Sequence, residues 1–236
     1  MGIETHELTL DAGRVRVSAE LEMPERPKSP FVLLTHGAGG DRSTPGLRAM
    51  ALGVASAGHP VVRADLPYRA AGRRSPPPAE KSVEGFKHLV MEARQQVGRG
   101  EVWIVGGRSY GGRVASLAVA AGLDAAGLIL YSYPLHRPGS PQNPRVDHWP
   151  AIKVPCLFLQ GTRDPFCDLR LLERNLESLG SRPTLRTVEG GDHSLSVASS
   201  HSPDGKAASE ESVVRTLLPE IVEWLRHVEG ATPRTS

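Results

Sequence analysis

A serine flanked by glycines stands in the stretch of the sequence that carries the most chemical information. Residues Gly107-Arg-Ser109-Tyr-Gly111 match the G-x-S-x-G pattern, in which a serine projects from a sharp turn between a strand and a helix. Small residues are needed on both sides of Ser109 because larger side chains would collide with the neighbouring strand and helix. The alternative is a Gly-rich turn that cradles a phosphate, but the stretch lacks both the Gly-Lys-Ser/Thr ending of a P-loop and the G-x-G-x-x-G of a dinucleotide site. We therefore interpret Ser109 as a nucleophile.

An aspartate and a histidine follow later strands and can reach Ser109. Asp164 and His193 each lie in a glycine-bearing loop after an apolar segment, and residues at the carboxyl ends of parallel strands gather at one edge of the sheet. The chain order Ser, Asp, His is that of the α/β-hydrolase triad. In this arrangement His193 takes the proton from Ser109, and Asp164 holds the imidazole. Asp168 and Asp192 stay open as alternative carboxylates, because an aspartate after a strand often caps the next helix.

A second glycine-rich loop, residues 36–40 with the sequence His-Gly-Ala-Gly-Gly, follows another apolar run. Backbone N–H groups that stabilise a developing oxyanion usually come from such a loop and from the residue after the nucleophile. Here those donors would be Ala38 and Tyr110, and we call residues 36–40 the oxyanion loop. A glycine-rich turn without a ligand is the alternative. We expect His36 to hold the loop in place and not to act as a base.

Arginines gather in the segment 66–79, which follows a strand and therefore lies at the ligand-binding edge of the sheet. Arg69, Arg73 and Arg74 could bind an anionic group there, although a solvated basic loop explains them as well. His148 is a further residue that could touch the substrate or support a residue that does. The candidate substrate contacts are Gly37, Tyr68, Arg69, Arg108 and His136.

The elements that position these residues alternate between strands and helices, which predicts a right-handed, mostly parallel α/β sheet with helices on both faces. An antiparallel hairpin is expected over residues 8–21, and the Pro-rich segment 132–150 is too short to form a lid domain. Pro219 is expected to kink or split the last helix. The predicted buried strands are 31–35, 60–64, 102–105, 126–131, 154–160 and 184–188, and the predicted helices are 45–57, 82–97, 110–121, 168–179 and 210–228.

Length and composition favour an ordinary globular protein with one domain over residues 1–236. The formal net charge of +2 is too small to indicate a nucleic-acid partner, and no apolar run is long enough to span a membrane. The N-terminal residues lack the pattern of a signal peptide, so we expect a cytoplasmic protein. Its two cysteines, Cys156 and Cys167, need no disulfide to explain them. No group of histidines and carboxylates has metal-ligand spacing, so we expect neither a metal nor another cofactor.

Together these motifs resemble those of the small α/β hydrolases related to testis-expressed protein thirty. That family is similar to dienelactone hydrolases and includes a regulatory subunit of a chromatin acetyltransferase complex. The resemblance implies the α/β-hydrolase fold, with Ser109 as nucleophile, Asp164 as acid and His193 as base. Dienelactone hydrolases differ in using a cysteine as nucleophile. The motifs are Thr35-His-Gly-Ala-Gly-Gly-Asp41, Gly106-Gly-Arg-Ser-Tyr-Gly-Gly-Arg113, Tyr133-Pro-Leu-His136 with Pro138-Gly139, Gly161-Thr-Arg-Asp-Pro-Phe166 and Gly191-Asp-His-Ser194.

These residues favour a serine hydrolase that cleaves a small ester, thioester or lactone through an acyl-enzyme. Its partner would be a small acyl substrate. Two alternatives stay open: a non-enzymatic protein-interaction module that keeps the fold, and a serine peptidase acting on short peptides. A binding module does not need a nucleophile, a base, an acid and an oxyanion loop in register, and the sequence offers no extra specificity domain for a peptidase.

Overall fold

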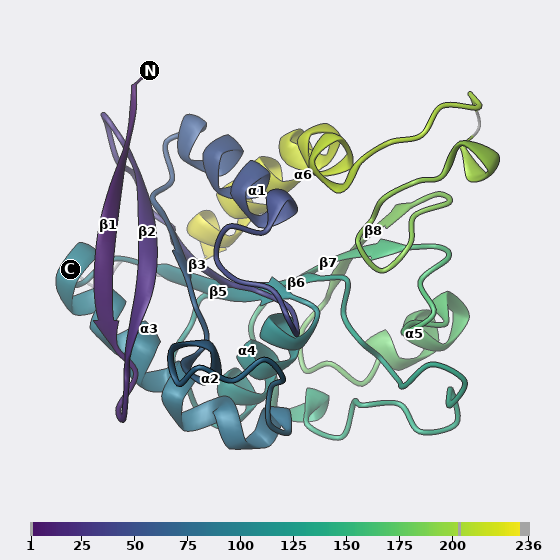
Figure 1. The fold of residues 1–236 in the computed structure, drawn as a ribbon, viewed down its shortest axis with the longest axis horizontal. Helices are drawn as coiled ribbons and strands as arrows, with labels where there is room; N and C mark the ends of the chain where they lie inside the picture. Colours follow the sequence, from purple (N-terminus) through teal and green to yellow (C-terminus); the bar gives the residue numbers. More distant parts are fainter. Residues whose placement is uncertain (1, 203, 232–236) are drawn as a thin grey trace.

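An eight-stranded sheet runs through the centre of the computed structural model, which describes residues 2–202 and 204–231 (Figure 1). Its strand order is β1-β2-β4-β3-β5-β6-β7-β8; β1–β2 and β2–β4 pair antiparallel, and the other neighbours pair parallel. This is the predicted α/β-hydrolase fold with an antiparallel hairpin at its N-terminus. The strands are β1 (Ile3–Asp11), β2 (Arg16–Pro24), β3 (Phe31–Thr35), β4 (Val61–Ala64), β5 (Trp103–Arg108), β6 (Gly127–Tyr131), β7 (Cys156–Gly161) and β8 (Thr184–Val188).

The hairpin is longer than the pattern over residues 8–21 predicts. Strand β1 begins at Ile3, and Ile3 pairs with Pro24 at the end of β2. Residues 4–7 are exposed, so they lack the alternation of buried and exposed side chains that marks a half-buried strand. Backbone pairing to β2 alone defines this part of β1.

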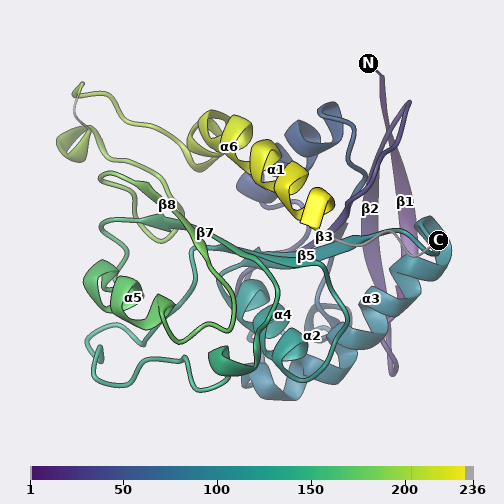
Figure 2. The same ribbon diagram turned by 180° about the vertical axis from the view of Figure 1, so that it is seen from behind.

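Helices cover both faces of the sheet, as Figures 1 and 2 show from opposite sides. Helices α1 (Pro45–Ser56) and α6 (Glu210–Ala231) pack together on one face. The other face carries α2 (Pro67–Ala70), α3 (Val83–Val97), α4 (Tyr110–Ala120) and α5 (Leu169–Leu176). Helix α6 is continuous through Pro219, so the predicted split of this helix is wrong.

Alternate residues of the central strands build two separate cores, one under each helical layer. Leu33 and Val105 belong to the core beneath α3, α4 and α5, whereas Val32 and Ile104 belong to the core beneath α1 and α6. This follows from the two-residue period of a strand, which sends neighbouring side chains to opposite faces. Burial on both faces explains why these strands read as continuous apolar runs.

The carboxyl ends of the parallel strands lead directly into the predicted site loops. The oxyanion loop follows β3, Ser109 follows β5, Asp164 comes shortly after β7, and His193 follows β8. Among the described residues, no helix combines the length and apolar character needed to cross a bilayer. The sheet therefore brings residues that are far apart in sequence to one edge.

Candidate active site

Ser109 is the single residue between strand β5 and helix α4. Its backbone has φ 49° and ψ −112°, a conformation that is costly for a residue with a side chain. The flanking glycines make this turn sterically feasible, because a Cβ on Gly107 would lie 2.3 Å from the carbonyl oxygen of Thr35, and one on Gly111 would lie 2.6 Å from that of His36. Packing of the turn against the end of β3 therefore requires both glycines.

A hydrogen-bonded chain links Ser109 to His193 and Asp164. The Oγ of Ser109 lies 2.8 Å from Nε2 of His193, and Nδ1 of His193 lies 2.7 Å from Oδ2 of Asp164. The carboxylate accepts the Nδ1–H, which leaves Nε2 free to accept the hydroxyl proton of Ser109. This is the tautomer that a base needs for activating the serine.

The carboxylate of Asp164 is buried and has partners besides the imidazole. Its Oδ2 accepts a hydrogen bond of 2.6 Å from Nε2 of Gln160, and its Oδ1 accepts one of 2.8 Å from the backbone N–H of Phe166. The Phe166 ring also packs on the imidazole of His193, with 4.3 Å between ring centroids. Carboxylate and imidazole are therefore both held in fixed orientations.

The two alternative carboxylates serve backbone groups instead. Asp168 caps helix α5 by accepting the N–H of Leu171 at 2.8 Å. Asp192 accepts the N–H groups of Ser194 at 2.7 Å and Ser196 at 3.0 Å, which stabilises the turn that carries His193. Of these three aspartates, Asp164 is the one that the structure brings to the imidazole.

His36 holds the oxyanion loop to the segment that follows β4. Its Nδ1–H donates to the carbonyl of Gly37 at 2.8 Å, and its Nε2 accepts the N–H of Leu66 at 3.0 Å. Burial lowers the pKa of His36, so the ring stays neutral and keeps this tautomer. The loop then passes beside the nucleophile: a Cβ on Gly37 would lie 3.4 Å from Cβ of Ser109.

The two predicted oxyanion donors have no hydrogen-bond acceptor in the part of the chain that the structure describes. Tyr110 is the first residue of α4, where a backbone N–H has no intrahelical partner. Ala38 lies in the oxyanion loop and is exposed, and its N–H is likewise unpaired. Within the described residues, neither N–H is used by the chain itself.

Comparison with known proteins decides the family. Residues 28–223, most of the chain, match the family described as an alpha/beta hydrolase domain. The chain belongs to the α/β hydrolases. In this fold the nucleophilic serine lies on a strand-to-helix turn and the histidine comes last in chain order. Ser109 after β5 and His193 after β8 occupy the corresponding positions.

Solved structures of hydrolases share the same fold over nearly their whole length. The dienelactone hydrolase of Anabaena variabilis is 18% identical, with a TM-score of 0.73 over 96% of this chain and 99% of that one. Est1E from Butyrivibrio proteoclasticus with ferulic acid bound is 16% identical, with a TM-score of 0.74 over 94% and 99% of the two chains. A lidless α/β serine hydrolase from Xanthomonas campestris is 20% identical, with a TM-score of 0.64 over 99% of both chains. Likeness at these identities concerns the fold, not the substrate.

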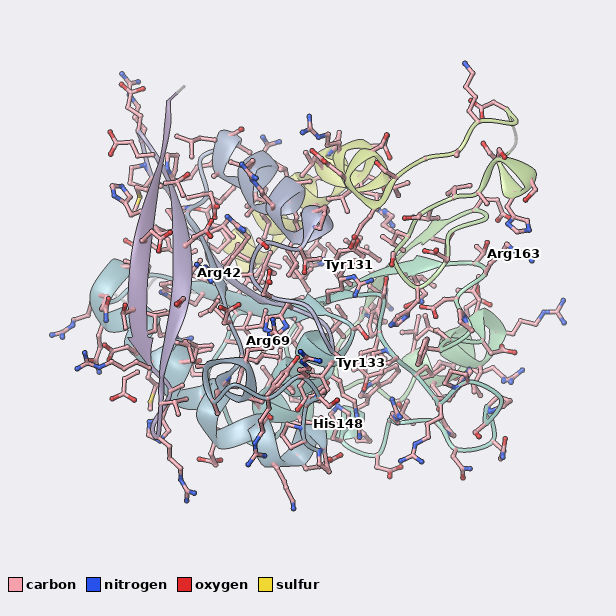
Figure 3. The ribbon with its side chains drawn as sticks, in the orientation of Figure 1. Arg42, Arg69, Tyr131, Tyr133, His148 and Arg163 are labelled. Atoms are coloured by element: carbon pink, nitrogen blue, oxygen red, sulfur yellow. The ribbon has the colours of Figure 1, made fainter. Side chains whose placement is uncertain are left out.

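Arg108 is a predicted substrate contact. In this α/β hydrolase its guanidinium instead belongs to a polar cluster next to Ser109 in the chain. Its Nε donates to Oε1 of Glu210 at 3.0 Å, and its guanidinium also donates to Oγ of Ser194 at 2.7 Å and to the carbonyl of His193 at 3.4 Å. The hydroxyl of Tyr131, labelled in Figure 3, donates to the same carboxylate oxygen of Glu210. We call Arg108, Tyr131 and Glu210 the elbow cluster. It connects the residue before Ser109 to the loop that carries the histidine.

Sequence reasoning missed two polar residues of this site, Glu210 and Gln160. Glu210 is the first residue of α6, and nothing in its local sequence distinguishes it from Glu211 beside it. Gln160 lies near the end of the apolar run that becomes β7. A polar residue in a strand predicted to be buried needs a hydrogen-bond partner, and this could have pointed to a role at the site. The side chain of Gln160 is buried and contacts Asp164.

The other candidate contacts have partners of their own. Both ring nitrogens of His136 engage backbone: Nδ1 donates to the carbonyl of Arg137 at 2.8 Å, and Nε2 accepts the N–H of Asp168 at 2.9 Å. His148 lies 2.8 Å from Oγ of Ser116 through its Nε2 (Figure 3). These contacts make His136 a link between two loops and attach His148 to helix α4.

Tyr68 and Arg69 belong to the short helix α2, next to the oxyanion loop. The hydroxyl of Tyr68 accepts the N–H of Gly39 at 3.3 Å, so it supports that loop directly. Arg69 is half-buried and labelled near the centre of Figure 3. Within the described residues no group of three or more potential metal ligands occurs, and both cysteines are free and buried.

Proposed function

We propose that this α/β hydrolase is a serine hydrolase that cleaves a small ester, thioester or lactone through an acyl-enzyme. The observation that carries the proposal is the continuous chain of hydrogen bonds from Ser109 Oγ through His193 to Asp164, with the serine on a strained turn. A partly buried imidazole that joins a buried carboxylate to one serine is the arrangement that activates a hydroxyl.

The first half-reaction forms the acyl-enzyme. His193 Nε2 takes the proton from Ser109 Oγ as that oxygen bonds to the substrate's carbonyl carbon. The carbonyl oxygen becomes negative and accepts hydrogen bonds from the N–H groups of Ala38 and Tyr110, each worth about 3 kcal/mol of barrier. The carbon–oxygen or carbon–sulfur bond to the leaving group then breaks, and the imidazolium returns the proton to that group.

The second half-reaction uses the same groups. His193 takes a proton from a water molecule, whose oxygen attacks the acyl carbon and releases the carboxylic acid as Ser109 regains its proton. Asp164 keeps the imidazole in the required tautomer and stabilises its positive form in both halves. Gln160 in turn fixes the carboxylate. All of these groups belong to the chain itself.

The proposed substrate class draws on the names of two structural neighbours and on the sequence motifs. One structural neighbour is named a dienelactone hydrolase, and another is described with ferulic acid bound; we extend small ester and lactone chemistry to this chain as part of the proposal. The sequence motifs add the resemblance to the small hydrolases related to testis-expressed protein thirty. The sequence expectation of a cytoplasmic location is also part of the proposal.

Labelling with a fluorophosphonate probe tests the nucleophile. Purified wild type should label and should hydrolyse p-nitrophenyl acetate and butyrate, and Ser109→Ala should do neither. Ser132→Ala is the matched control, because Ser132 is also buried, follows strand β6 and has a positive φ of 50°; it should keep labelling. A folded wild type that neither labels nor turns over would contradict the proposal and favour a protein-interaction module.

A further inference from the structure

A hollow of about 730 Å³ lies between the β1–β2 turn, helix α2 and the start of α3. Figures 1 and 2 show these three segments close together at one corner of the molecule. We call this hollow the basic groove. Its floor includes apolar or aromatic surface from Pro67, Tyr68, Ala71 and Pro77. This volume is large enough for an organic group of small-ligand size.

Positive charge dominates the lining of the basic groove. Arg14, Arg73 and Lys81 line it, and none of their side chains contacts a carboxylate in the described part of the chain. Its acidic residue, Glu84, lies 3.2 Å from Nζ of Lys87. Three cations without counter-ions around one hollow create a local field that attracts anions.

Two tyrosines connect the basic groove to the proposed active site. Tyr68 lines the groove, while its hydroxyl accepts the N–H of Gly39 in the oxyanion loop. Its ring meets that of Tyr110 edge-on, with 6.0 Å between centroids. The hydroxyl of Tyr110 in turn donates to the carbonyl of Pro77 at 2.9 Å and lies 2.8 Å from Oγ of Ser82, two groups of the groove lining. A ligand that rests on Tyr68 therefore lies one side chain away from the oxyanion loop.

A fourth cation stands on the other side of Tyr68. Arg69 neighbours Tyr68 in α2, the helix that contacts the oxyanion loop through the Tyr68 hydroxyl, and is half-buried. Arg69 has no carboxylate partner in the described residues. Unpaired cations thus continue from the oxyanion loop past Tyr68 into the groove.

We propose that the basic groove binds the anionic end of the substrate, a carboxylate or phosphate joined to the scissile ester bond by an apolar spacer on either its acyl or its leaving-group side. This inference rests on the proposed serine-hydrolase function and narrows its substrate class to anionic esters. Arg14, Arg73 and Lys81 attract the anion, and the spacer lies on Tyr68 and the neighbouring prolines.

Matched esters test the proposal. The p-nitrophenyl monoesters of dicarboxylic acids from succinate to sebacate are compared with neutral esters of the same length, and with esters whose chain ends in phosphate. A parallel series places the anion on the leaving group, as acetate esters of ω-hydroxy acids. Wild type should prefer an anionic member of either series, and 0.5 M NaCl should weaken that preference because salt screens exposed charges.

The double variant Arg73→Ala/Lys81→Ala should lower kcat/KM for the preferred anionic ester about tenfold, as expected for losing two exposed charge contacts. Its kcat/KM for the neutral ester of equal length should stay unchanged. Arg99→Ala, an exposed cation in the turn before strand β5, is the matched control and should change neither value. Equal kcat/KM for both esters in wild type, or an equal loss for both in the double variant, would overturn the subsite.

Fluorophosphonate labelling separates failure of this inference from failure of the proposed function. If wild type labels but does not prefer anionic over neutral esters, the proposed substrate subsite is wrong and the serine-hydrolase proposal stands. If wild type does not label, the hydrolase proposal and the substrate subsite fail together. Calorimetric titration with sebacate then decides whether the groove binds anions at all: binding by wild type that the double variant loses supports an anion site, and equal heats in both exclude one.

Discussion

Arg108 and Glu210 are 102 residues apart in the sequence and meet through a hydrogen bond of 3.0 Å from Nε to Oε1. This contact joins the residue before the proposed nucleophile to the first residue of helix α6. The same guanidinium holds the loop that carries His193. Glycine at the start of α1 leaves room for the cluster, since a Cβ on Gly46 would lie 2.5 Å from the hydroxyl oxygen of Tyr131 and 2.6 Å from Oε1 of Glu210.

Replacing Glu210 should therefore slow the chemical step. In Glu210→Ala, Arg108 and Tyr131 lose their shared acceptor, and the histidine loop shifts relative to Ser109. A displacement of about 1 Å in a catalytic group can cost about 100-fold, so we expect kcat to fall about 10- to 100-fold with little change in KM. Steady-state kinetics on p-nitrophenyl acetate measure both constants.

Glu211→Ala is the matched control for that variant. Glu211 is the next residue and pairs with Arg215 on the exposed face of α6. Its removal should leave kcat unchanged, whereas Glu210→Asp should recover part of the lost rate. Full activity in Glu210→Ala would mean that the elbow cluster does not position the histidine loop.

The acid of the proposed triad can be tested by a change of one functional group. In Asp164→Asn the amide oxygen can keep the hydrogen bond from Phe166, which leaves the NH2 group as a donor facing Nδ1 of His193. This favours the wrong tautomer, so we expect the rate to fall by about three or more orders of magnitude, as for His193→Ala. Asp168→Asn, in the N-cap of α5, should keep activity and affect mainly helix stability. If the Asp168 variant lost activity and the Asp164 variant kept it, the assignment of the acid would be reversed.

Stability should depend on pH through His148. Desolvation, with a further contribution from Arg113, lowers the pKa of its imidazole to about 4 in the folded protein, against 6.5 in the unfolded chain. Between these values the unfolded state binds a proton that the folded state does not, so the free energy of unfolding decreases as pH falls from about 6.5 toward 4. The expected loss from pH 7 to pH 4.5 is about 2 kcal/mol from this residue.

Urea unfolding of wild type and His148→Gln at both pH values measures that contribution. The variant should lose less stability on acidification, because its side chain does not titrate, while the other buried histidines remain in both proteins. Identical losses in the two proteins would show that His148 is not the group responsible.

Much of the fold and the proposed triad could be predicted because the signals are local. Strands buried on both faces, such as β3 and β5, appear as apolar runs, and the residues that follow them must lie at the carboxyl edge of the sheet. The glycines around Ser109 reflect contacts with backbone atoms of β3, which any sequence with this turn must accommodate. The placement of Asp164 and His193 at the same edge follows from the strands that precede them, whereas the choice of Asp164 over Asp168 and Asp192 needs the contacts of the structure.

The remaining features depend on side-chain directions that no periodicity encodes. The positive charge of Arg108 suggests a contact with the substrate. It pairs instead with Glu210, because the long connection after β8 brings the start of α6 next to the end of β5. His136 likewise has the character of a site residue, yet both ring nitrogens bind backbone. The outer half of β1 is exposed, so only pairing with β2 determines its extent.

His36 and His136 hold their loops through main-chain groups only, each ring joining a carbonyl on one side to an N–H on the other. Every amino acid supplies a carbonyl, and every one except proline supplies an N–H. Mutations that exchange the side chains of the partner residues therefore leave these attachments intact. Both loops can thus change their side chains at these positions while their backbone paths stay fixed, provided that the residue supplying the N–H does not become proline.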